Sequence, residues 1–96
     1  MLIDYYKAIE DSSRKMLEAA KTKDLDGMMR YEGVCAVLIE QLRYKSRVEE
    51  LAPEHQHEKT RIMQRILRND AEIRYLTEPW LPQIEQLFEG SQRVLH

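Results

Sequence analysis

Apolar side chains recur along most of the chain at spacings of three and four residues, which is the period of an amphipathic helix. The first such stripe consists of Leu2, Tyr6, Ile9, Ser13, Met16, Leu17 and Ala20. A charged stretch follows, in which Asp24 is a suitable N-cap for a second helix and Asp26 adds negative charge to its first turn. The pattern predicts a first helix over residues 1–21.

The second segment, residues 25–51, carries two apolar stripes. The first stripe consists of Leu25, Met28, Met29, Cys35, Ala36, Ile39 and Leu42. The second consists of Gly33, Val37, Tyr44, Val48 and Leu51, rotated from the first by roughly 120–160° at about 100° per residue. A helix that is apolar on two sides needs two neighbours, or one neighbour and a partner.

Pro53 ends this segment and suits the first turn of a third helix, since its missing N–H has no acceptor there. The third helix is predicted over residues 53–76. Its main stripe consists of Ile62, Ile66, Ile73 and Leu76, and Asn69 interrupts it. A polar residue in an apolar stripe often sets the register at some cost in stability. Met63 and Leu67 form a minor second stripe.

A pair of prolines separates the third helix from a fourth. Pro79 and Pro82 are both tolerated only within the first turn of a new helix, and the residue before a proline is pushed out of the αR region. Residues 77–80 are therefore predicted to form a corner, with Thr77 as the cap of the fourth helix. The helix after the corner, residues 79–94, has an apolar stripe that includes Trp80, Leu81, Ile84, Leu87 and Phe88.

These four segments predict the fold class. Short connections favour antiparallel neighbours, and the chain shows no strand pattern and no internal repeat. We expect a single all-α domain over residues 1–96, an antiparallel bundle of three long helices plus a shorter C-terminal helix after a proline corner. A chain of this size buries only roughly 60–70% of its extended surface, so a partner or a second copy would add stability.

Composition excludes several classes of function. The net charge of −2 argues against a nucleic-acid or membrane surface that depends on bulk charge. One cysteine cannot form an internal disulfide, and no run approaches the roughly 20 apolar residues of a membrane span. The N-terminus lacks the features of a signal peptide. We therefore expect a soluble cytoplasmic protein.

Residues that could support catalysis or metal binding lack the partners they need. Glu54 and His57 have the spacing of a di-metal carboxylate site, but such a site needs a second unit and two further glutamates. Cys35 lies in the apolar stretch VCAVLI and is predicted to be a core cysteine. Ser12 and Ser13 have no nearby base, and there is no glycine-rich phosphate loop. We expect no enzyme activity, no cofactor and no metal.

Two surface features have alternative interpretations. Arg61, Arg65 and Arg68 could contact phosphate, but adjoining acidic residues and the negative net charge favour a solvated helix face. The second stripe of the second helix could be core against a fourth helix, or it could be a docking groove for an amphipathic helix of a partner. Both interpretations hold if the fourth helix covers the groove and can leave it.

Two stretches resemble FliT-type flagellar chaperones. They are SRKMLEAAKTKDLDGMMRYEGVCAVLIEQLR (13–43) and RIMQRILRNDAEIRYLTEPWLPQIEQL (61–87). The resemblance implies a cytoplasmic type III export chaperone for the filament-cap protein of the bacterial flagellum. It further implies binding to the flagellar master transcription regulator and to the export ATPase complex. In this family the last helix can cover the partner site and shifts to expose it.

The resemblance assigns roles to residues of this chain. The groove would involve Val37, Tyr44, Val48, Met63, Ile66 and Leu67. The hinge and lid would consist of Thr77, Pro79, Trp80, Leu81, Ile84, Leu87 and Phe88. One alternative is regulation of transcription as the main role, through a protein rather than DNA. Another is a structural helical module that packs its two-sided second helix in a homodimer.

Overall fold

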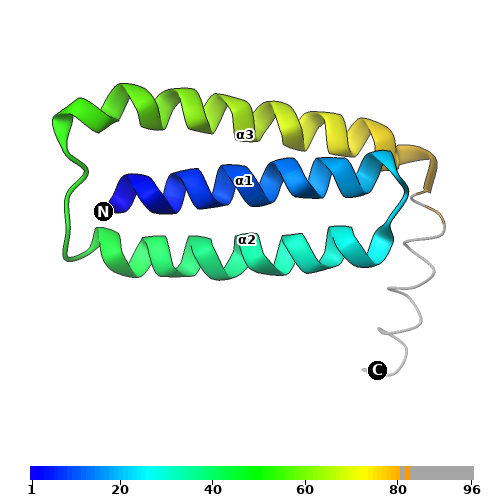
Figure 1. Ribbon diagram of the computed structural model, residues 1–96, viewed down its shortest axis with the longest axis horizontal. Helices are drawn as coiled ribbons and strands as arrows, with labels where there is room; N and C mark the ends of the chain where they lie inside the picture. Colours follow the sequence, from blue (N-terminus) through cyan, green and yellow to red (C-terminus); the bar gives the residue numbers. More distant parts are fainter. Residues whose placement is uncertain (81, 83–96) are drawn as a thin grey trace.

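The computed structural model describes residues 1–80 and 82. This part of the chain forms three long helices, α1 (Leu2–Lys21), α2 (Leu25–Ser46) and α3 (Gln56–Thr77), shown in Figure 1. Two short 3₁₀ turns, η1 (Pro53–His55) and η2 (Glu78–Trp80), flank α3. No strand occurs in the described residues, which confirms the all-α class. The predicted fourth helix, residues 79–94, lies almost entirely outside the described residues.

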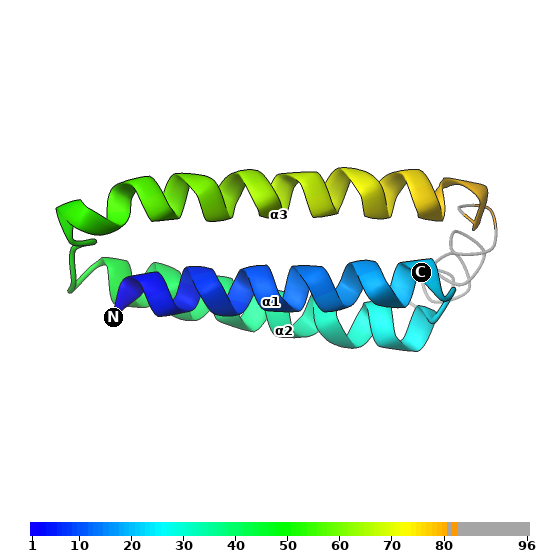
Figure 2. The ribbon, with the colours of Figure 1, turned by 45° about the horizontal axis from the view of Figure 1, so that its top comes forward.

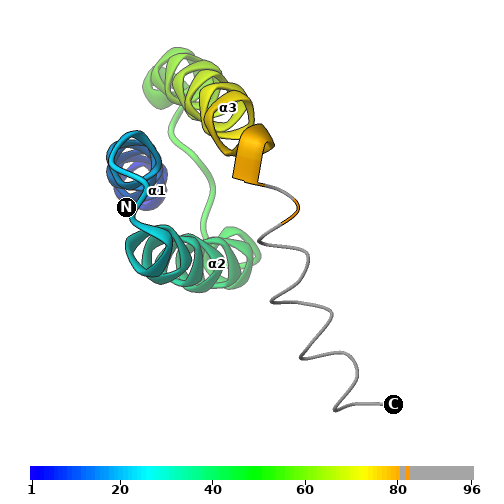
Figure 3. The ribbon, with the colours of Figure 1, turned by 90° about the vertical axis from the view of Figure 1, so that its right-hand side faces the viewer.

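The three helices run up, down and up, with α1 in the middle (Figure 1). Both α2 and α3 pack along α1, whereas they make little contact with each other. The end-on view in Figure 3 shows α1 at the corner of an open V whose arms are α2 and α3. Three long antiparallel-connected helices are therefore present as predicted, but within the described residues they do not close into a bundle.

The turn between α1 and α2 is built as the sequence predicts. Lys23 adopts the left-handed backbone conformation, with φ of 59°, and the Asp24 amide donates to the Ala19 carbonyl over 2.8 Å. The Asp24 carboxylate then accepts a hydrogen bond of 2.9 Å from the Gly27 amide. This bond satisfies one of the amides at the start of α2 that have no partner within the helix. Asp24 is confirmed as the N-cap.

Removing this cap has a measurable cost. We expect Asp24→Ala to lower the free energy of unfolding by about 1 kcal/mol, because the Gly27 amide loses its acceptor. The thermal midpoint should fall by roughly 4–8 °C. Asp24→Asn keeps a side-chain acceptor and serves as the matched control in thermal denaturation followed by circular dichroism. Equal losses in both variants would contradict the capping role.

The end of α2 differs from its predicted position. The helix ends at Ser46 rather than at residue 51, and Arg47 and Val48 continue only as a turn closed on the carbonyls of Tyr44 and Lys45. Ala52, which precedes Pro53, has the extended conformation (φ −60°, ψ 142°) that a following proline favours. The connection must also cross from α2 to α3, which are not neighbours (Figure 1). Residues 47–51, which were predicted to be helical, belong to this connection instead.

The end of α3 lies one residue beyond its predicted position. Thr77 is buried, and its hydroxyl donates to the Arg74 carbonyl, so it closes α3. Glu78 remains in the αR region (φ −52°, ψ −44°), although it precedes Pro79. The chain therefore tightens into η2 instead of leaving helical conformation abruptly. The corner expected at residues 77–80 coincides with this turn.

Buried apolar residues lie mainly on α1 and on the face of α3 that meets it. They are Leu2, Ile3, Ile9, Leu17, Ala19, Ala20, Ile62 and Ile73. A cluster of Leu17, Ala20 and Ile73 lies where the end of α1 meets the end of α3, and Met28 of α2 packs against it. Of α2, only Gly27 is buried. Most of the apolar surface of α2 therefore takes no part in the core of the described residues.

Candidate partner-binding surface

The side of α2 that packs on α1 is set by a close approach at its first turn. A Cβ atom added to Gly27 would lie 3.3 Å from the Cβ of Ala19, so the two backbones nearly touch there. The half-buried residues along this side are Met28, Tyr31, Cys35, Leu38 and Leu42. Met29 and Ile39, which belong to the first apolar stripe of the sequence, are 61% and 40% exposed. The side that packs on α1 therefore shares Met28, Cys35 and Leu42 with the first stripe but is rotated from it.

A strip of apolar side chains faces outward on α2 and its C-terminal turn. This outer strip consists of Val37, Tyr44 and Val48, which are 57%, 66% and 76% exposed. On the helix, Val37 and Tyr44 lie about 140° from the line that packs on α1. Tyr44 also lines a surface hollow of ≈ 380 Å³ together with Tyr5, Glu40, Gln41 and Lys45. All of the residues that line this hollow belong to α1 or α2.

A second strip lies on α3. This α3 strip consists of Met63 and Leu67, 39% and 63% exposed, with the half-buried Ile66 beside them. On α2, Ile39 lies on the same side of the helix as Met28. Met28 packs against the cluster that contains Ile73 of α3. Ile39 therefore faces the side of the molecule on which α3 lies. Sequence reasoning missed Ile39, because two apolar stripes of equal strength do not reveal which one meets the neighbour.

The six predicted partner-binding residues thus occupy two separate surfaces. Val37, Tyr44 and Val48 are exposed on the outer strip, and Met63, Ile66 and Leu67 are exposed or half-buried on the α3 strip. The structure does not bring the two sets into one groove, because α1 lies between α2 and α3. Contiguous exposed apolar side chains on a small protein are typical of an interaction site.

The predicted hinge and lid are only partly described. Thr77 is buried, Trp80 is half-buried and Pro79 is exposed at the end of α3. The remaining predicted lid residues, Leu81, Ile84, Leu87 and Phe88, lie outside the described residues.

Within the part of the chain that the structure describes, no group of three metal-binding side chains comes together. Glu54 and His57 line a hollow of ≈ 400 Å³ with Glu58 and two arginines. Cys35 is half-buried rather than enclosed in the core. Burial, and to a lesser degree the nearby Glu32 carboxylate, raises the pKa of its thiol, so it stays protonated at neutral pH. A reactive thiolate is therefore not favoured at this position.

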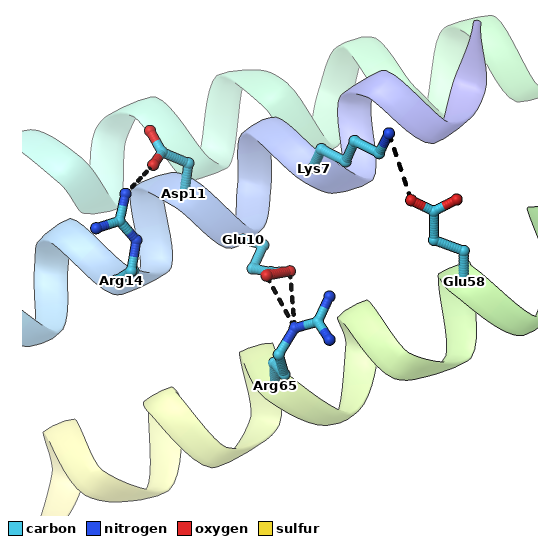
Figure 4. Close-up of polar contacts among 6 residues, drawn as sticks. All are labelled: Lys7, Glu10, Asp11, Arg14, Glu58 and Arg65. Carbon is cyan, nitrogen blue, oxygen red and sulfur yellow. Dashed lines mark hydrogen bonds and ion pairs between the residues drawn. The ribbon is translucent and has the colours of Figure 1, made fainter.

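Polar contacts link α1 to α3, as Figure 4 shows. Lys7 pairs with Glu58 over 3.3 Å, and Arg65 Nε donates to both carboxylate oxygens of Glu10 over 2.9 and 3.2 Å. The hydrogen bond to Glu10 raises the pKa of Arg65. The central arginine of the basic α3 face is thus engaged within the protein, which favours the interpretation of that face as solvated surface.

Within α1, Asp11 pairs with Arg14 (Figure 4) and, over 3.2 Å, with Lys15. The Arg14 hydrogen bond, followed by the Lys15 one, holds the pKa of Asp11 below its usual value. These contacts support the exposed face of the helix.

A family model described as flagellar protein FliT matches residues 3–94 of the chain. No curated protein and no solved structure matches the chain. Among the described residues, no helix is both long enough and apolar enough to cross a membrane.

Proposed function

The chain belongs to the FliT family of flagellar chaperones, and from this premise we propose that it captures the filament-cap protein of the bacterial flagellum in the cytoplasm before type III export. The observation that carries the proposal is the apolar surface left exposed on α2 and α3. A chaperone must shield an apolar segment of its client, and it can do so only with apolar surface that its own core does not use.

Capture would follow the mode in which an amphipathic helix lies along an apolar surface. Met63 and Leu67 would supply the anchors on the α3 strip, and Tyr44, on the outer strip, would anchor a separate segment of the client. Exposed charges such as Lys45 and Arg68 would orient the client rather than add much affinity. The open V of the three helices supports this proposal, because a client helix would supply the neighbour that α2 and α3 each lack.

The direct test is binding of purified filament-cap protein to the purified chain, measured by isothermal titration calorimetry. We expect a complex of defined stoichiometry with a negative heat-capacity change, which is the mark of apolar burial. A heat-capacity change near zero, or no complex with the cap protein at all, would exclude the proposal.

We further propose that Trp80 and the residues that follow it, to about Gly90, form a removable cover that is hinged at Thr77 and Pro79. A site that is open only part of the time binds with an apparent affinity reduced by the open fraction. If the cover is closed about nine-tenths of the time, a chain ending at Pro79 should bind the cap protein about tenfold more tightly. Calorimetry on the full and shortened chains measures this ratio. A shortened chain that keeps its helix content but gains no affinity contradicts the cover.

The flagellar master transcription regulator and the export ATPase complex are further partners that we propose on the basis of the family. A regulator that docks on the same apolar surface would compete with the cap protein. In a gel-shift assay the chain should then release the regulator from promoter DNA without binding DNA itself. Direct, salt-sensitive DNA binding would instead favour a role for Arg61 and its neighbouring arginines.

The alternative function is a structural helical module in which the outer strip packs permanently in a homodimer. Sedimentation of the full chain and of Val48→Asp distinguishes the two. A dimer that Val48→Asp converts to a monomer, without any capture of the cap protein, would favour the structural module.

A further inference from the structure

The contact between α1 and α3 changes in character along its length. In the half nearest η1, the ion pairs Lys7–Glu58 and Glu10–Arg65 join the two helices, as Figure 4 shows. The Lys59 ammonium also lies 5.5 Å from the centre of the Tyr6 ring. The first half of α3 contributes a single buried residue, Ile62. This half is therefore held by Ile62, by the half-buried Ile66 and by three partly exposed polar contacts.

The other half of the contact is apolar and involves all three helices. Leu17 and Ala20 of α1 and Ile73 of α3 form the cluster against which Met16, Met28 and Leu76 pack. The half-buried Asn69 marks the boundary between the two halves. Figure 1 shows α1 and α3 converging toward the end with the cluster, and Figure 2 shows them running side by side along their length. Because α2 makes little contact with α3, no third helix among the described residues supports the polar half.

We propose that residues 56–68, the first half of α3, form a flap that detaches from α1 while the second half stays in place. Asn69 marks the hinge, and the Lys7, Glu10 and Lys59 contacts are the latch. The inference deepens the proposed function, because detachment uncovers Ile62 beside the α3 strip and lengthens the apolar surface offered to a client. An apolar client segment would be received between α1 and the open flap.

The dependence of opening on salt concentration distinguishes the contribution of the latch from that of the apolar cluster. Exposed ion pairs each change an opening equilibrium by roughly two- to fivefold, and salt screens them. Apolar contacts do not lose strength in this way. A detached segment of this length is also too short to remain helical in water, so its amides become open to exchange. Opening of the flap should therefore depend on salt and appear as hydrogen exchange confined to residues 58–68.

The experiment is hydrogen exchange with mass spectrometry on the full chain at about 0.05 M and 0.5 M NaCl. We expect the amides of residues 58–68 to exchange about fivefold faster or more at the higher salt, whereas those of residues 70–77 do not change. The double variant Glu10→Gln/Arg65→Gln should exchange faster in the same segment already at low salt and should lose most of its salt dependence. Equal acceleration along the whole of α3, or none, overturns the proposal.

A matched control comes from the same helix. Arg74 pairs with Asp70 over 3.1 Å within α3, so this pair does not bridge to α1. Arg74→Gln removes an exposed pair of similar geometry and should leave the exchange of residues 58–68 and its salt response unchanged. Protection of α2 amides in the double variant shows that the protein remains folded. A response of Arg74→Gln equal to that of the double variant would contradict the latch.

The exchange experiment contains no client, so its outcome is independent of capture. A salt-dependent flap in a chain that does not bind the cap protein would leave the flap standing and exclude the proposed function. Capture of the cap protein by a chain whose α3 amides exchange uniformly would support the proposed function and exclude the flap.

Discussion

Leu17→Ala should lower the free energy of unfolding by about 3 kcal/mol, with a fall of more than about 10 °C in the thermal midpoint. Leu17 is 6% exposed and lies in the cluster with Ala20 and Ile73, where all three helices meet. Truncation removes its transfer free energy and leaves a cavity between helices that relax only in part. Urea denaturation followed by circular dichroism measures the change.

Leu67→Ala is the matched control, because the same side chain is removed at a position that is 63% exposed on the α3 strip. We expect a change within about 0.5 kcal/mol, as is usual for surface positions. If the two variants lose similar stability, then Leu67 is packed in solution and the α3 strip is core rather than a docking surface. The pair therefore tests the boundary between core and free surface directly.

Capture of the filament-cap protein should weaken by about 100-fold when Met63 and Leu67 are both replaced by Asp. Removing two apolar anchors and placing carboxylates against an apolar client helix costs roughly 2–3 kcal/mol of binding free energy. Helix content should not change, because Leu67 is exposed and Met63 is partly exposed. Calorimetry gives the affinity, and circular dichroism confirms the fold.

Two comparisons locate the client on the molecule. Gln64→Asp adds a charge to an exposed position of α3 between the same two residues in sequence but on a different face, and it should bind as the unaltered chain does. Tyr44→Ala and Val48→Asp test the outer strip in the same assay. Loss of capture only in the outer-strip variants would move the client to α2, and unchanged capture in every variant would exclude both surfaces.

The separation of the outer strip from the α3 strip bears on what one client can do. A single straight helix cannot lie against Val37 and Met63 together, because α1 keeps their helices apart. One chaperone could therefore hold two segments of a client, or a client and a second protein. Competition between the cap protein and the regulator would show whether the two strips act separately.

Local interactions explain which features were predictable from sequence. The ends of α1, the cap at Asp24 and the corner at Pro79 depend on residues within one or two turns, so spacing and residue type suffice to locate them. Family membership was also predicted from sequence, from two stretches that both lie within the matched residues 3–94.

The packed side of α2, the place where it ends and the division of its apolar residues depended on distant parts of the chain. Val37 and Ile39 are both apolar and both suit a buried helix face, so nothing local ranks one stripe above the other. The approach of Gly27 to Ala19 sets the rotation of α2, and the distance between α2 and α3 sets the length of their connection. Helix formation depends on residues that are close in sequence. Burial of a helix face depends on the element that packs against it, and that element can be distant in sequence.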